Sequence, residues 1–309
     1  MSTHRRAYAL VSLILYLILA SCTGSPVPES IEDTQLAEPE TPEDKPATSE
    51  PVATETGILS PTSTSLDETQ VSLYGIEFAF DSSLGEIIKV EKLDGSPCDS
   101  MNPQPAHIVF SFEFYNVARN FRSPTLSVYS VQEYEQLCPD PDWLIGFFDP
   151  LREAITNQSV PPSLSGPEGG RTFEVQRVRS GYFQFQNGAG IQAIVSYGQD
   201  LYFIERDNIE YKFEGLTYDG EYYVEIHIPV TAPFLIEMYE PGQPQNEQTI
   251  PVPEHDPSDY QQFAQAVEAY NEEARKQLEA LEASGFTPDL RELDALVASL
   301  RIEPQAWGE

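Results

Sequence analysis

Basic residues are scarce in this chain of 309 residues, which has 17 Lys and Arg against 50 Asp and Glu. The formal net charge at pH 7 is −33. Proteins that bind nucleic acid neutralise phosphates with clustered Lys and Arg, so the composition excludes that class of partner. Anionic lipid headgroups would also repel such a chain. Its acidity either attracts cations and basic partners or serves solubility alone.

Catalytic signatures are missing as well. The sequence contains four histidines and no His-Glu-x-x-His, Gly-x-Ser-x-Gly or Gly-Lys-Ser/Thr motif. We interpret His107 and His227, which lie in strand patterns, as surface or structural histidines, and His255 as part of a helix start. The sequence predicts no catalytic residue, no metal ligand and no cofactor. The sequence favours a non-catalytic protein over an enzyme. A catalytic pair of acidic side chains that are brought together only by the fold stays open.

Long apolar runs are absent too. Residues 7–20 are apolar apart from one serine, whereas a transmembrane helix needs about 20 residues. Two arginines precede this run and small residues end it, which is the pattern of a secretory signal. Its ending, LASC, resembles the bacterial lipobox, which implies cleavage before Cys22 and acyl chains such as palmitate on that cysteine. We predict a lipoprotein signal peptide over residues 1–21; the alternative is a plain signal peptide with an incidental cysteine.

Acylation of Cys22 would make the lipid bilayer a partner of this protein. An Asp after the cysteine would resemble a signal for retention at the inner membrane, and Thr23 stands there instead. The predicted location is therefore the cell envelope, on the outer face of the cytoplasmic membrane or on the outer membrane.

Residues 22–68 have few large apolar side chains and are rich in Pro, Thr, Ser and Glu. Their 11 acidic residues stand against one basic residue, Lys45. Such a segment cannot bury enough apolar surface to offset the entropy lost on ordering, so we predict a disordered tether. A flexible chain of this length spans roughly 40 Å, and proline and self-repulsion extend it further. We expect the rest, residues 69–309, to form a single domain.

Only three cysteines occur. With Cys22 used for the anchor, Cys98 and Cys138 remain as a pair in an exported protein, and an oxidising compartment favours a disulfide between them. The bridge would close a loop of about 40 residues and stabilise the fold by roughly 3–4 kcal/mol. Two separate buried thiols are the alternative, since two cysteines without nearby histidines do not make a metal site.

Bulky side chains at alternate positions predict strands in the first half of the domain, followed by a helix over residues 142–157 that Pro150 interrupts. A hairpin is predicted where Asp219-Gly220 joins two alternating runs, because both central residues of a type I′ turn need positive φ. Two helices end the chain, one from Pro257 to about residue 284 and one over residues 287–300. The predicted fold is α+β, a mostly antiparallel β-sheet covered by two or three helices. The strands of the first half are expected over residues 71–80, 86–93, 107–115 and 126–131.

The motif NGAG raises the question of whether Gly188 and Gly190 hold a ligand. A phosphate-binding loop joins a strand to a helix, whereas strand patterns lie on both sides of this one. We predict a hairpin turn in which Asn187 and Gly188 have positive φ. Aromatic and amide side chains on the hairpin arms are a candidate binding surface for glycan or peptide, and ordinary pairing of aromatics across strands is the alternative. This candidate surface consists of Tyr182, Gln184, Gln186, Tyr197 and Tyr202.

Several stretches resemble a set of uncharacterised bacterial exported lipoproteins: VYSVQEYEQL, FQNGAGIQAIVSYGQ and YKFEGLTYDGEYYVEIHIPV. Those proteins share an aromatic-Gln-Asn-Gly hairpin and an Asp-Gly hairpin that ends in Pro-Val. The likeness covers most of residues 126–300 and carries no known chemistry. The stretches GIEFAFDSSLG and LDALVASL are similar to parts of PsbP/Mog1-like domains, which implies an antiparallel sheet between helices that is used for binding.

These features predict a membrane-anchored extracytoplasmic lipoprotein whose domain is a non-catalytic binding or envelope-assembly module. Its ligand would be an unknown protein, peptide or glycan. The alternative is an extracytoplasmic hydrolase that uses acidic residues.

Overall fold

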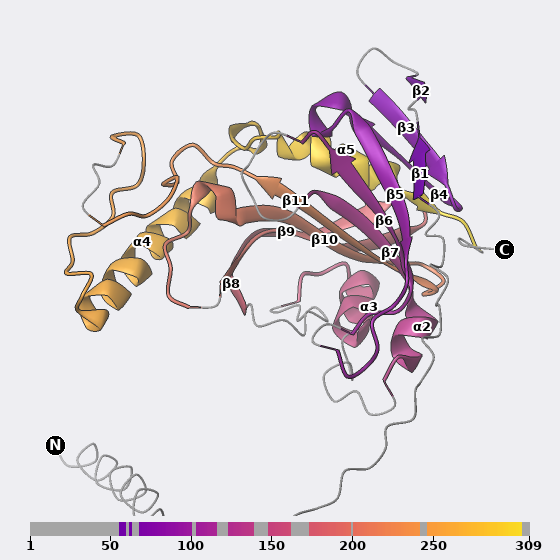
Figure 1. The fold of residues 1–309 in the computed structure, drawn as a ribbon, viewed down its shortest axis with the longest axis horizontal. Helices are drawn as coiled ribbons and strands as arrows, with labels where there is room; N and C mark the ends of the chain where they lie inside the picture. Colours follow the sequence, from indigo (N-terminus) through magenta and orange to yellow (C-terminus); the bar gives the residue numbers. More distant parts are fainter. Residues whose placement is uncertain are drawn as a thin grey trace, which may run out of the picture. The chain divides into compact units, whose positions relative to one another are not determined.

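The computed structural model describes most of the chain from residue 56 onward (Figure 1). These residues belong to one compact unit, Val52–Glu309. The predicted signal peptide, Cys22 and the tether as far as residue 55 lie outside the described residues. The described ranges are 56–59, 62–63, 68–100, 103–115, 123–138, 148–161, 173–198, 200–241 and 246–304.

The larger of two antiparallel sheets has eight strands within these ranges, in the order β1-β5-β6-β7-β11-β10-β9-β8. Every neighbouring pair of strands in it is antiparallel. Its strands are β1 (Thr56–Leu59), β5 (Ile87–Leu93), β6 (His107–Glu113), β7 (Thr125–Ser130), β8 (Phe173–Phe185), β9 (Gly188–Gly198), β10 (Ile209–Thr217) and β11 (Tyr222–Val230). The smaller sheet, in the order β12-β4-β3-β2, contains β2 (Thr62–Ser63), β3 (Glu68–Leu73), β4 (Ile76–Asp81) and β12 (Arg301–Ile302).

Two short strands belong to the last part of the predicted tether. β1 pairs with β5, from Thr56 opposite Glu91 to Leu59 opposite Ile88. β2 pairs with β3 in the smaller sheet. Strand pairing therefore starts before residue 69, where the sequence placed the domain boundary.

The described residues also form four helices: α2 (Val131–Gln136), α3 (Phe148–Asn157), α4 (Tyr260–Ala280) and α5 (Leu290–Ser299). The prediction of an α+β fold with mostly antiparallel sheet is confirmed. Pro150 lies in the first turn of α3, where a helix needs no backbone N–H donor. α4 begins at Tyr260 because the Asp259 carboxylate caps its first turn. No helix in the described ranges is long and apolar enough to cross a bilayer.

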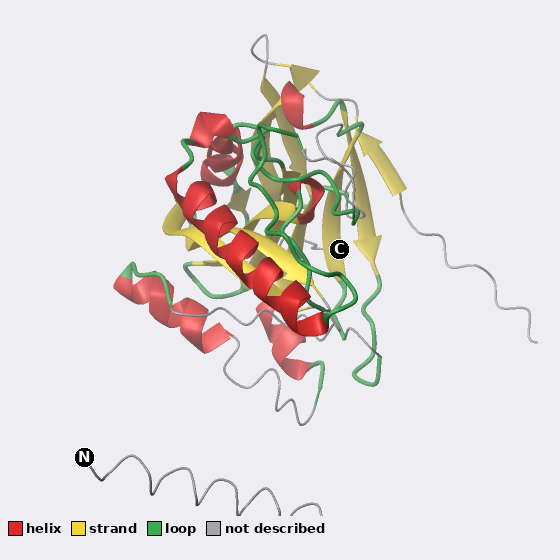
Figure 2. Ribbon diagram, turned by 90° about the vertical axis from the view of Figure 1, so that its left-hand side faces the viewer, coloured by secondary structure: helices red, strands yellow, loops and turns green. Residues whose placement is uncertain are grey.

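The two faces of the large sheet differ because successive residues of a strand point to opposite faces. On β10, Tyr211 and Phe213 belong to the main hydrophobic core, which the smaller sheet, α4 and α5 cover. Figure 2 shows α4 crossing the strands on this side. On the opposite face, α2 and α3 pack against a smaller apolar cluster that includes Leu216 and Tyr223. We call this second face the polar face, for the charged side chains described below.

The hairpin predicted at NGAG is present, and Gln186 and Asn187 connect β8 to β9. The prediction of positive φ at Asn187 and Gly188 is wrong, since neither is among the described residues with positive φ. Glycine is needed here for space instead. A Cβ on Gly188 would lie 2.0 Å from the Phe185 ring, and one on Gly190 would lie 2.1 Å from the Glu214 carbonyl oxygen.

The hairpin predicted at Asp219-Gly220 joins β10 to β11. Of its two central residues only Gly220 has positive φ, at 74°. The turn is therefore not the type I′ turn that the dipeptide suggested. The Asp219 carboxylate instead accepts a hydrogen bond from the backbone N–H of Glu221 at 3.0 Å, which holds the loop by a side-chain contact.

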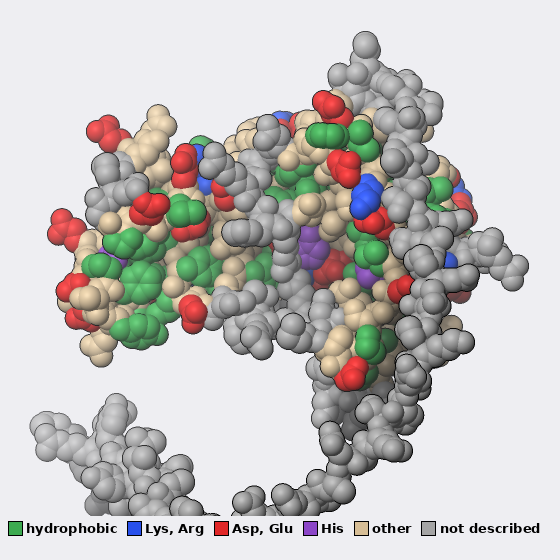
Figure 3. All heavy atoms as spheres, in the orientation of Figure 1, with side chains coloured by type: hydrophobic (Ala, Val, Ile, Leu, Met, Phe, Trp, Pro, Cys, Tyr) green, Lys and Arg blue, Asp and Glu red, His purple; other side chains and the backbone are tan. Residues whose placement is uncertain are grey.

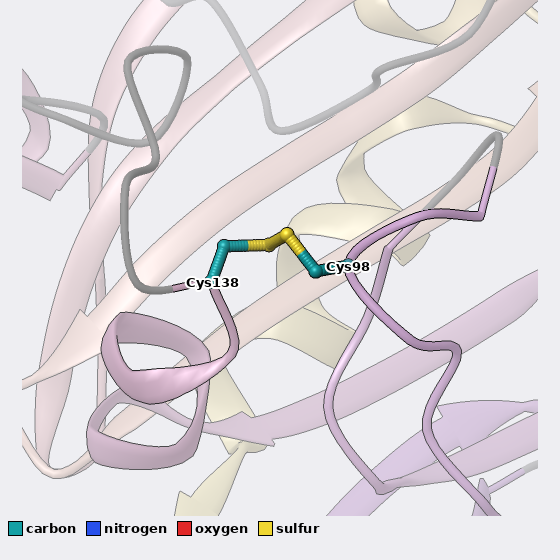
Figure 4. Close-up of a disulfide and its surroundings, with 2 residues drawn as sticks. All are labelled: Cys98 and Cys138. Carbon is teal, nitrogen blue, oxygen red and sulfur yellow. A yellow bond between two sulfur atoms is a disulfide. The ribbon is translucent and has the colours of Figure 1, made fainter.

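The predicted disulfide between Cys98 and Cys138 is confirmed, with the two Cα atoms 5.3 Å apart. Figure 4 shows the bridge linking the end of α2 to the loop that precedes β6. Cys98 is exposed, whereas Cys138 is buried.

Candidate functional site

Charged side chains gather on the polar face near the middle of the large sheet. Glu210, Lys212 and Glu214 occupy alternate positions of β10, and Glu225 and His227 occupy alternate positions of β11. The register places Lys212 opposite His227 and Glu214 opposite Glu225. In Figure 3, histidine and carboxylate atoms lie side by side near the centre of the view. We define the charged cluster as these five residues and Arg177 of β8: Arg177, Glu210, Lys212, Glu214, Glu225 and His227.

Five of the six residues of the charged cluster are buried, and Arg177 is partly buried. Lys212 is 2 % exposed, Glu214 1 % and His227 8 %. Moving one ion from water into a protein interior costs several kcal/mol unless partners compensate it. The contacts within the cluster therefore decide which protonation states are stable.

His227 lies between two carboxylates. Its Nδ1 is 2.9 Å from Glu210 Oε1, and its Nε2 is 2.9 Å from Glu225 Oε1. An ionised carboxylate can only accept a hydrogen bond, so both ring nitrogens carry a proton and the ring is an imidazolium. Burial alone would lower the pKa of His227, but attraction by Glu225 and Glu210 and the hydrogen bonds to both raise it to about 10. His227 is thus a fixed cation at neutral pH.

Lys212 supplies a second cation. Its Nζ lies 3.3 Å from Glu214 Oε1 and 3.9 Å from Glu225 Oε1. The hydroxyl of Tyr223 donates to the same Glu214 oxygen at 3.2 Å. Burial, and then repulsion of a phenolate by Glu225 and Glu214, raise the pKa of Tyr223 well above its usual value. Tyr223 therefore stays protonated and serves as a donor.

Arg177 closes the cluster on the β8 side. Its guanidinium binds both oxygens of Glu174, with Nε to Oε1 at 2.8 Å and Nη2 to Oε2 at 2.6 Å. The same Nη2 lies 3.7 Å from Glu214 Oε2. A bidentate pair fixes the guanidinium plane, so Arg177 is held in one orientation beside Glu214.

Aromatic rings border the charged cluster. The Tyr129 ring lies 5.7 Å from that of Tyr223, and His107 stacks on Tyr129 with centroids 4.5 Å apart. His107 Nδ1 lies 2.9 Å from the carbonyl oxygen of Pro105 and donates to it. Burial lowers the pKa of His107, against the effects of that hydrogen bond and of Glu225. The face thus holds a neutral histidine and a charged one.

The structure separates the residues of the candidate binding surface. Tyr182 is half-buried against the apolar cluster on the polar face, and Gln184 donates to its hydroxyl at 3.3 Å. Tyr197 borders the charged cluster, with its ring centroid 5.6 Å from Lys212 Nζ. The other two members make contacts elsewhere. Gln186 donates to the carbonyl of Ser299, the last residue of α5. The hydroxyl of Tyr202 bonds that of Ser196, which faces away from Tyr197.

The charged cluster was not predicted from the sequence. His227 was interpreted as a surface or structural histidine, and Lys212 and Glu214 were not singled out. The signal lies in EYKFEG and VEIHI, where charges alternate with large apolar residues. That pattern ordinarily marks a strand with one solvated face. Here β10 and β11 have strand neighbours on both sides and their charged side chains are buried, so the same pattern produces a buried network.

Within the described ranges, no three His, Cys, Asp or Glu side chains are grouped as metal ligands would be. Every charge of the cluster that we describe has a protein partner of opposite charge within 4 Å. No protein-family model, no curated protein and no solved structure matches this chain.

Proposed function

We propose that this protein is a lipid-anchored extracytoplasmic binding protein whose ligand site is the polar face at the charged cluster. The observation that carries the proposal is the burial of His227, Lys212 and their glutamates on one face of the central strands. The ligand would be a protein, peptide or glycan that presents polar groups to this face.

A contribution to folding stability is a weak explanation for a buried network of charged side chains. Replacing a buried ion network by apolar side chains of similar volume is often neutral or stabilising by about 1–4 kcal/mol. Ionisable groups with strongly perturbed pKa values gather at functional sites. The sheet already has a large apolar core on its other face, so a second core here would have been the simpler arrangement.

Binding is favoured over hydrolysis by the contacts that the ionisable groups make. Both nitrogens of His227 are occupied by carboxylates, so the ring has no lone pair for a general base. Burial raises the pKa of Glu205 and that of Asp294. Glu205 accepts from the backbone N–H of Tyr239, and Asp294 accepts from Tyr211 on the opposite face of the sheet. These two carboxyls support structure away from the cluster.

The anchor and the disulfide fit the same proposal. A bond between Cys98 and Cys138 is typical of proteins in an oxidising compartment. Acylation of Cys22 and the tether after it would hold the binding face at a distance from the bilayer. This arrangement suits capture of a ligand in the cell envelope.

The decisive experiment compares ligand binding by the wild type with that of cluster variants. The mature chain is screened against peptides and envelope glycan fragments by thermal shift, and hits are measured by calorimetry. Glu225→Gln, the mildest change, and Lys212→Met should each weaken binding at least tenfold. Lys276→Met is the matched control, since Lys276 forms an exposed pair with Glu272 on α4. Equal affinity in wild type and both cluster variants would refute the assignment of the site.

A further inference from the structure

The disulfide joins the two segments that border the polar face at the His107 end. Residues 94–106 lead directly into His107, the first residue of β6. α2 ends at Gln136, two residues before Cys138. The bridge therefore ties the approach to β6 to the end of α2 (Figure 4).

A continuous series of aromatic contacts runs from these two segments to the charged cluster. His107 stacks on Tyr129, and Tyr134 of α2 lies 5.5 Å from the same Tyr129 ring. Tyr129 in turn lies 5.7 Å from Tyr223, whose hydroxyl donates to Glu214. Both ends of the disulfide thus converge on one aromatic stack, and that stack is in contact with the cluster.

Residues 94–106 have a few contacts besides the disulfide. Ser96 pairs with Gln104 in both directions, Ser100 N–H donates to the carbonyl of Pro97, and the Pro105 carbonyl accepts from His107 Nδ1. Within the described ranges, none of these hydrogen bonds reaches α2. The disulfide is accordingly the strongest link between this loop and α2. Its Cys98 end is exposed, so a reductant in the envelope can reach it, whereas Cys138 is buried.

We propose that the Cys98–Cys138 disulfide is a redox latch that ties the loop before β6 to α2, beside the aromatic stack of His107, Tyr129 and Tyr134 at one end of the polar face. The reductant is a dithiol of the thioredoxin-like class. Its thiolate attacks Cys98 Sγ, the S–S bond breaks, and Cys138 leaves as a thiolate that takes up a proton. The second thiolate of the dithiol then releases Cys98 as a thiol. Two electrons and two protons pass to the protein, and the dithiol becomes a disulfide.

Opening the latch frees the loop from α2 while the sheet stays paired. His107 keeps its register opposite Tyr129, but the loop whose Pro105 carbonyl it bonds is no longer tied to α2. Movement of that loop gives the His107 ring access to water. The regulatory meaning of the latch rests on the proposed binding function. The latch itself is detectable without any ligand, so its failure can be told apart from the failure of that function.

The experiment is histidine NMR on the mature chain, oxidised and after reduction by a thioredoxin-like dithiol. Reduction should move the pKa of His107 upward toward 6.5, because burial is what lowers it. The signals of His255, which packs with Phe203 near α4, should not move and serve as the internal control. The double variant Cys98→Ala, Cys138→Ala should reproduce the reduced spectrum, which excludes an effect of the reductant.

Three results would overturn the latch. Reduction could leave the titration of His107 unchanged, the dithiol could fail to reduce the folded protein, or reduction could unfold the sheet as a whole. Hydrogen exchange of β10 and β11 separates local opening from global unfolding, since these central strands should keep their protection if only the latch opens.

Discussion

His227 and Glu225 lie two residues apart on β11 and are joined by a contact of 2.9 Å between Nε2 and a carboxylate oxygen. Residues two apart in a strand share a face and have Cα atoms about 6.6 Å apart, so strand geometry alone brings these side chains together. Glu210 on the neighbouring strand takes the other ring nitrogen at 2.9 Å. The protonated state of His227 is thus a consequence of two adjacent strands in one register.

The first prediction concerns pH. The pKa of His227 is about 10 in the folded protein and its ordinary value is 6.5, so its stabilising contribution is complete below pH 6.5 and is lost as pH rises through 10. The free energy of unfolding, measured by urea denaturation, should fall by several kcal/mol across this interval, because each tenfold difference in proton affinity corresponds to about 1.4 kcal/mol. His227→Gln should remove this slope. A wild-type curve that is flat from pH 7 to 10 would contradict the assignment of the imidazolium.

The second prediction concerns Lys212. Lys212→Met leaves Glu214 and Glu225 buried with less compensation, and removing one partner of a buried pair costs about 3–5 kcal/mol. Lys276→Met, at an exposed i,i+4 pair that solvent screens, should change stability far less than Lys212→Met. Denaturant unfolding of both variants at pH 7 measures the difference. Equal effects would show that the Lys212 ammonium contributes no more than a surface charge.

The third prediction concerns glycines with different roles. A Cβ at Gly190 would lie 2.1 Å from the Glu214 carbonyl oxygen and 2.6 Å from the Cα of Gly215, and backbone atoms of a central strand cannot move aside. Gly190→Ala should therefore destabilise by more than about 2 kcal/mol. A Cβ added at Gly220 would have no atom within 4 Å, but the residue has φ +74°. Because Asn tolerates this left-handed conformation, Gly220→Asn should cost only a few tenths of a kcal/mol. Thermal unfolding of the two variants measures the difference. A larger loss of stability in Gly220→Asn than in Gly190→Ala would contradict the prediction.

The fourth prediction is a stabilising substitution. Gln176 is buried, and neither its amide nitrogen nor its amide oxygen has a hydrogen-bond partner among the described residues. Gln176→Leu should raise the free energy of unfolding by about 1–2 kcal/mol, because it removes an unsatisfied polar group from the interior. Asn271→Leu is the matched control: its amide bonds the Ile204 N–H at 2.9 Å and the Tyr202 carbonyl at 3.0 Å, so this change should destabilise. A loss of stability in Gln176→Leu would mean that its amide is satisfied in solution.

The fifth prediction concerns the anchor. In the proposed lipoprotein, Cys22→Ala would remove the acceptor of the acyl chains, and the remaining chain is too acidic to stay on anionic lipid by charge. The variant should appear in the soluble fraction of the envelope, whereas Cys98→Ala should fractionate with membranes as the wild type does. Membrane association that survives in Cys22→Ala would exclude acylation as the attachment.

Much of the fold was predictable because it depends on local signals. Alternation of bulky residues predicted the strands, Asp219-Gly220 and NGAG predicted two hairpins, and two remaining cysteines predicted one bridge. Turn geometry was predicted less well: at NGAG the glycines are required by neighbours from β10 that are distant in sequence. α2, a helix of six residues capped by Ser130, was missed because so short a segment has no helical period to detect.

The sequence by itself determined the class of fold and the cysteine pair, since each follows from composition or from neighbours in the chain. Only the tertiary structure decided that Glu210, Lys212 and His227 are buried. The alternation of charged and apolar residues in β10 and β11 predicts strands with one solvated face. Whether that face is buried depends on the strands and helices that pack around it, and these are distant in sequence. The buried histidine cation between two carboxylates is therefore a product of sheet order and register, and the proposed function depends on it.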